Sequence, residues 1–172
     1  MGVLVGAANL NGQQLPMYTQ YVFEPVMINP AFAGVENSLK ASLMTRQQWT
    51  GVEGAPKAYV LSAHQPFILS SSIGGIMHLD QVGAKKEVGM FGIYGYKIRI
   101  YEGYLRMAMQ VGGVHYSSDF SSLPLYDEDG NKVNDPVYNE DVSKFLPNVG
   151  TGVLFQKKNY FAGVSVPRLW NS

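Results

Sequence analysis

The chain has 172 residues, of which 46% are hydrophobic and only 15% are charged. This charged fraction is low against about 25% for a typical soluble domain, and thirteen basic residues balance thirteen acidic ones, so composition indicates no nucleic-acid partner. The absence of cysteine excludes disulfides and zinc–thiolate sites. The sequence contains no run of 18 apolar residues, so no membrane-spanning helix is expected.

The first residues, MGVLVGAANLNG, are small and apolar, and they resemble the end of the hydrophobic region of a secretory signal peptide. The stretch contains no basic n-region, because the first positively charged side chain in the sequence is Lys40. We therefore expect residues 1–15 to be either a residual signal peptide or a disordered tail.

Residues 16–37 are rich in prolines and aromatic side chains. Prolines at positions 16, 25 and 30 argue against a regular helix or a central strand. Several aromatic residues in the same stretch need burial, so we expect a packed, extended segment that precedes the strands.

Seven strands are expected from the alternation of apolar and polar residues, at about 39–48, 58–66, 73–79, 88–100, 104–116, 147–156 and 160–166. The fourth and fifth form a long hairpin joined by a Tyr-Glu-Gly turn. Their arms are about twice the usual strand length of five or six residues and suit tilted strands crossing a bilayer.

The hairpin separates two kinds of side chain. In its second arm, the face with Met107 and Met109 is apolar, and the face with Arg106 and Gln110 is polar. Apolar residues against lipid and polar residues toward a lumen are typical of a transmembrane barrel, as are abundant tyrosines. Phe91 and Ile93 depart from this pattern, since they lie on the polar face of the first arm.

The connections are expected to alternate in length. Loops at 49–57, 80–87 and 117–145 are long, whereas the intervening turns are short. Outer-membrane barrels have long outer loops and short periplasmic turns, which would place the 16–37 segment in the periplasm. Bacterial single-chain barrels have an even strand number, so residues 38–172 are expected to form an incomplete barrel, an open all-β antiparallel sheet. A soluble lipocalin-like barrel, the alternative fold, would instead bury its apolar face inward.

Four stretches, in order, carry a resemblance to a known family: YTQYVFEPVMINPAFAG (18–34), RQQWTGVEGAPKAYVLSAHQP (46–66), the loop around Asp135-Pro136, and FAGVSVPRL (161–169). The chain resembles the PorP/SprF family, outer-membrane proteins of the type IX secretion system of Bacteroidota. The resemblance implies a transmembrane β-barrel that works in secretion, surface attachment or export of a gliding adhesin. Its implied partners are outer-membrane lipid, other secretion components, and an exported adhesin or C-terminal-domain substrate.

Two stretches are candidates for binding a partner. The first outer loop offers Trp49, Gly51, Gly54 and Pro56, although a plain rim turn with a Trp in the aromatic belt explains these residues as well. The N-terminal candidates are Tyr18, Tyr21, Phe23, Asn29 and Pro30.

No catalytic, cofactor-binding or metal-binding residue is expected. His64, His78 and His115 lie on different strands without a metal-ligand spacing, and Asp127 and Asp129 lack the spaced glutamate of an EF-hand. Ser62 and His64 lack a nucleophile elbow. The sequence therefore predicts a non-enzymatic secretion barrel, with a passive porin or hydrophobic-solute channel as the alternative.

Overall fold

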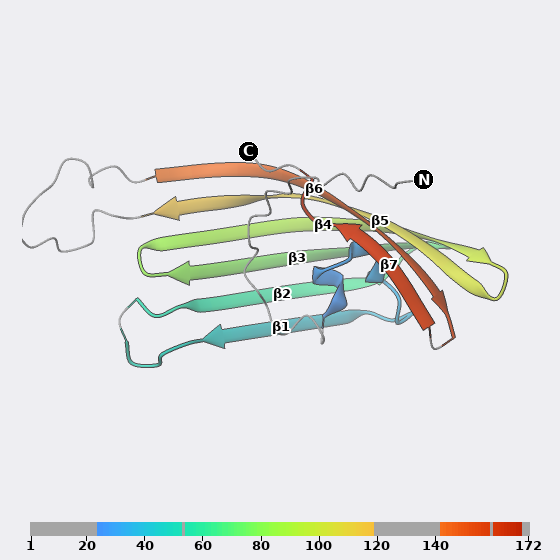
Figure 1. Ribbon diagram of the computed structural model, residues 1–172, viewed down its shortest axis with the longest axis horizontal. Helices are drawn as coiled ribbons and strands as arrows, with labels where there is room; N and C mark the ends of the chain where they lie inside the picture. Colours follow the sequence, from blue (N-terminus) through green and yellow to red (C-terminus); the bar gives the residue numbers. More distant parts are fainter. Residues whose placement is uncertain (1–23, 53, 119–141, 159, 170–172) are drawn as a thin grey trace, which may run out of the picture.

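A computed structural model describes residues 24–52, 54–118, 142–158 and 160–169. Seven strands form one antiparallel sheet in sequence order, each paired with the next (Figure 1). The strands are β1 (Lys40–Gln47), β2 (Lys57–Pro66), β3 (Ser71–Val82), β4 (Lys85–Ile100), β5 (Gly103–Ser118), β6 (Val142–Lys157) and β7 (Tyr160–Val166). Within the described residues, the predicted number and order of strands are confirmed.

Within the described part of the chain, no helix has the length and apolar character needed to cross a membrane.

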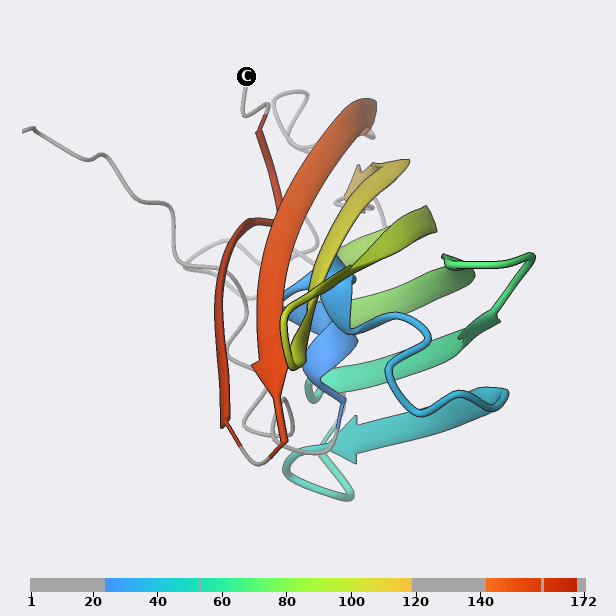
Figure 2. The ribbon, with the colours of Figure 1, turned by 90° about the vertical axis from the view of Figure 1, so that its right-hand side faces the viewer.

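The sheet curls into an open half-barrel with a concave and a convex face (Figure 2). Along β2, buried and exposed residues alternate strictly from Lys57 to His64. The convex face exposes large apolar side chains, among them Leu43, Leu61, Met77, Met90, Tyr94, Met109, Val111, Val149 and Val153. A sheet with its apolar side chains turned outward contradicts the lipocalin-like alternative and agrees with an open transmembrane barrel.

The β4–β5 hairpin has the two faces expected from the sequence. Met107 and Met109 are exposed on the convex side, whereas Arg106 and Gln110 are buried on the concave side. Phe91 and Ile93 are also buried there, which explains their departure from the polar pattern. Part of the concave face is covered by residues before the first strand, so apolar side chains on it are buried away from water.

The connection between β3 and β4 differs from expectation. Residues 80–87 were expected to form a long loop, but β3 continues to Val82 and β4 begins at Lys85, which leaves a two-residue turn. The polar residues there are paired strand positions, such as Asp80 opposite Glu87. Polarity alone was a poor guide, because strand ends that reach water carry polar side chains on both faces. The loop after β1 is long as predicted, and most of the predicted loop after β5 lies outside the described residues.

The N-terminal segment, defined here as residues 24–36, packs on the concave face of the sheet (Figures 1 and 2). Its expected extended conformation is wrong, because two 3-10 turns occur, η2 (Pro25–Met27) and η3 (Pro30–Phe32). Each begins at a proline, whose fixed φ suits the first position of a helical turn. The core consists of Val26, Ala31 and Ala33 from this segment with Val60, Ile76, Ile93, Ala108 and Leu154 from the sheet.

Candidate functional site

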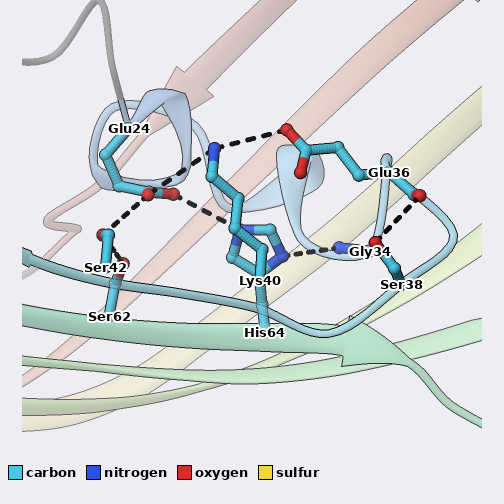
Figure 3. A network of polar contacts seen from close by, with 8 residues as sticks. All are labelled: Glu24, Gly34, Glu36, Ser38, Lys40, Ser42, Ser62 and His64. Atoms are coloured by element: carbon cyan, nitrogen blue, oxygen red, sulfur yellow. Dashed lines mark hydrogen bonds and ion pairs between the residues drawn. The ribbon is translucent and has the colours of Figure 1, made fainter.

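The N-terminal segment is attached to β1 and β2 through Glu24, whose side chain is only 1% exposed (Figure 3). Oε2 of Glu24 accepts a hydrogen bond from Ser42 Oγ at 2.8 Å, and Ser42 Oγ lies 2.7 Å from Ser62 Oγ. Lys40 Nζ lies 3.6 Å from the same carboxylate. Because an unpaired buried charge is costly, these partners are what allow Glu24 to be buried.

His64 binds the segment at two points (Figure 3). The backbone N–H of Gly34 donates to Nδ1 at 3.2 Å, so this nitrogen carries no proton. The ring proton is therefore on Nε2, which donates to Glu24 Oε1 at 3.3 Å. A single imidazole thus connects residues from both ends of the N-terminal segment to β2.

A strand in the middle of the sheet also contacts the N-terminal segment at Gly34. Nη1 of Arg106, on β5, donates to the carbonyl oxygen of Gly34 at 3.2 Å. Gly34 has a φ of +71°, and a Cβ at this position would collide with Ser72. Glycine is required here both for the left-handed backbone and for the close approach to the sheet.

Asn29 attaches the segment to β6 and β7. Its Oδ1 accepts from Ala31 N at 2.9 Å and caps η3, while its Nδ2 donates to the carbonyl oxygens of Val153 at 3.1 Å and Val164 at 3.4 Å. The side chain lies over Gly152, where any Cβ would overlap Asn29 Oδ1. A glycine on the sheet therefore makes room for the amide that binds it.

Two further contacts strengthen this attachment. Ser165 Oγ donates to the carbonyl oxygen of Ile28 at 2.7 Å, and the rings of Phe32 and Phe161 meet edge to face at 5.8 Å. The N-terminal segment is thus bound to β1 and β2 on one side and to β6 and β7 on the other. It connects the two edges of the open sheet across its concave face.

The β1–β2 loop, described at residues 48–52 and 54–56, lies at the opposite end of the strands from the β4–β5 turn. Trp49 is 71% exposed, and Gly51 and Gly54 have positive φ values of 94° and 74°. The carbonyl oxygen of Gly54 accepts from Gly83 N at 2.9 Å, which ties the loop to the β3–β4 turn. A shallow pocket beneath the loop is lined by Arg46, Gln48, Pro56, Lys57, Ala58, Asp80 and Val82.

The side chains around Glu24 are not arranged in the order of a catalytic triad. A triad places the histidine between the nucleophile and the acid, whereas here the carboxylate lies between Ser42 and His64. His64 and His78 are buried, whereas His115 is exposed, and no cluster of metal-ligating side chains occurs among the described residues. In this structure the cluster joins the N-terminal segment to β1 and β2.

A protein-family model described as "Type IX secretion system membrane protein PorP/SprF" matches residues 10–172. The chain belongs to the PorP/SprF family. This confirms the resemblance carried by the four sequence stretches, and it makes the chain a membrane component of the type IX secretion system. Comparison with curated proteins and with solved structures found no match.

The partner-binding candidates fall into two groups. Asn29 and Pro30 are buried in the interface between the N-terminal segment and the sheet, whereas Trp49, Gly51 and Gly54 are exposed on the loop. Pro56 is half-buried, and Tyr18, Tyr21 and Phe23 lie outside the described residues. Sequence reasoning missed Glu24, Ser42 and Arg106, although a glutamate within an apolar, proline-rich segment is a signal for a buried polar contact.

Proposed function

We propose that the chain is part of a non-enzymatic outer-membrane barrel that binds, anchors or helps to export a secreted surface protein of the gliding-adhesin type. The observation that carries this proposal is the match of the PorP/SprF family over residues 10–172. The exposed apolar convex face supports contact with lipid, since membrane barrels turn such a face outward. The partners would be other secretion components and the exported protein.

The loop at residues 48–56 is the best candidate on this chain for contact with the exported protein. Trp49 is exposed, and the pocket beneath the loop combines the charges of Arg46, Lys57 and Asp80. An exposed aromatic residue beside a pocket lined by both apolar and charged side chains is typical of protein-binding surfaces, where aromatic residues contribute much of the binding energy.

A passive porin or hydrophobic-solute channel is the alternative function. A porin needs a water-filled lumen, but here the N-terminal segment occupies the concave face that would line one. Several polar groups on that face are engaged with the segment, as Arg106 is with Gly34 and His64 is with Glu24. This packing favours a binding role over free diffusion of solutes.

Photo-crosslinking in cells that express the protein tests the proposal. A photoreactive amino acid in place of Trp49 should give a crosslink to an exported surface protein, and one in place of Lys158, at the other end of the strands, should not. The purified protein should also show little conductance in planar bilayers. Steady open-channel conductance without any crosslink from position 49 would favour the porin.

A further inference from the structure

One turn of the sheet exposes only apolar side chains and a serine. The β2–β3 turn has Phe67, Ile68 and Leu69 with 51%, 64% and 96% of their surface exposed. The β4–β5 turn at the same end of the strands contains Glu102, and the β6–β7 connection follows Lys157 and contains Lys158. Adjacent exposed apolar side chains in a tight turn indicate contact with something other than water.

The backbone of this turn is well defined. Phe67 N donates to Ser71 O at 2.9 Å, and Ser71 Oγ donates to Ile68 O at 2.6 Å. Leu69 has a φ of 58°, a conformation that leucine rarely adopts. The hydrogen bonds therefore hold Leu69 in an exposed position despite an unfavourable backbone conformation.

The turn continues the apolar convex face. Lys97 N donates to Ser70 O at 2.7 Å, and Ser71 is paired with Tyr96. Tyr96 and Ile98 are both exposed on the convex side of β4. The turn therefore lies beside apolar outer-face residues, while the β4–β5 hairpin extends farther along the strands (Figure 1).

A row of polar residues lies at the other end of the convex face. Consecutive strand pairings place six of them side by side: Gln47, Lys57, Gln81, Lys86, Ser117 and Ser143. Along β3, Gln81 and Ser71 are ten residues apart, which is about 33 Å along the strand. If the strand is tilted by about 40° from the membrane normal, this length covers about 25 Å of membrane thickness, which is the height of the apolar band of a membrane barrel. The β2–β3 turn thus lies one apolar thickness away from the polar row.

We propose that the β2–β3 turn inserts into the interface of the bilayer, so that Phe67, Ile68 and Leu69 contact lipid. The inference depends on the placement of the convex face in lipid under the proposed function. It adds a specific anchoring element, located at the end of the strands opposite Trp49. The other two connections at that end would remain in water because they carry charged side chains.

Spin labelling of the protein reconstituted in phosphatidylethanolamine–phosphatidylglycerol vesicles tests this proposal. Single cysteines at Leu69, Met109 and Lys158 carry the label, and collision with oxygen is compared with collision with a nickel chelate. Lys158 is the matched control, since it is also an exposed non-glycine turn residue with positive φ, 45° against 58°. The oxygen-to-nickel ratio at Leu69 should lie between the ratios at Met109 and Lys158 and exceed that at Lys158 several-fold.

Fluorescence gives a second measurement that needs no cysteine. Tryptophan in place of Ile68 should be quenched by brominated lipids at least twice as strongly as tryptophan in place of Lys158. Equal ratios and equal quenching at the two turns, with Met109 in lipid, would overturn this inference and leave the proposed function intact. A water-exposed Met109 would overturn both. A Leu69 label exposed to nickel in vesicles but shielded from it in native membranes would identify a protein partner instead of lipid.

Discussion

The imidazole of His64 lies 3.3 Å from the carboxylate of Glu24, although forty residues separate them in the chain. The same ring accepts a hydrogen bond from Gly34, ten residues after Glu24. These contacts close the N-terminal segment onto β2, and Asn29 attaches it to β6 and β7. Variants of these residues test whether the segment holds the curvature of the sheet.

Replacing Glu24 by alanine should destabilise the protein by about 1–3 kcal/mol, because the buried polar groups of Ser42 and His64 lose their partner. Glu36→Ala is the matched control, since Glu36 also pairs with Lys40 but is 55% exposed. Exposed ion pairs contribute about 0–1 kcal/mol. Urea unfolding of the reconstituted protein measures both variants. Equal losses would show that burial of Glu24 is not important for stability.

Gly152→Ala should displace Asn29 and loosen the N-terminal segment from β6 and β7, because the added methyl group overlaps the Asn29 side chain. Gly92→Ala is the control, since a Cβ there meets no atom closer than 3.9 Å. Limited proteolysis should cut the segment at least several-fold faster in the Gly152 variant only. If the Gly92 variant is cut equally fast, the effect is general and not due to Asn29.

Met109→Arg should cost about 2–4 kcal/mol of stability in a bilayer, as a charge near mid-membrane on the lipid side does. Ser143→Arg is the control, because Ser143 is exposed in the polar row, where the expected cost is about 0–1 kcal/mol. Denaturant titration in lipid vesicles measures the difference. The concave neighbour Gln110 is a poor control, since it is buried and donates to the carbonyl oxygen of Pro167 at 2.7 Å. Similar costs for the two arginines would argue against contact of the convex face with lipid.

The two ends of the strands should face opposite sides of the outer membrane. Lys86 lies by the β3–β4 turn, at the end with Trp49, and Lys158 lies at the other end. On intact cells, an impermeant thiol reagent should label cysteine in place of Lys86 but not cysteine in place of Lys158. Disruption of the outer membrane should make Lys158 reactive. Labelling of both positions before disruption would contradict this topology.

Sequence reasoning went furthest where alternation is long and unbroken. The β4–β5 hairpin was predicted with its faces correctly assigned, because side chains of a strand point alternately to its two sides. It did less well at strand ends, where polar residues at 80–87 look like a loop and form paired strand positions.

The sequence alone determined the all-β class, seven strands, their order and the family, since these depend on local periodicity and on motifs present in the chain. Only the tertiary structure placed Glu24 beside Ser42 and His64, and Asn29 over Gly152. Such contacts depend on how far the sheet curves and on which concave positions lack a Cβ. Residues 18 to 135 positions apart then meet, and no local pattern in the sequence encodes their distance.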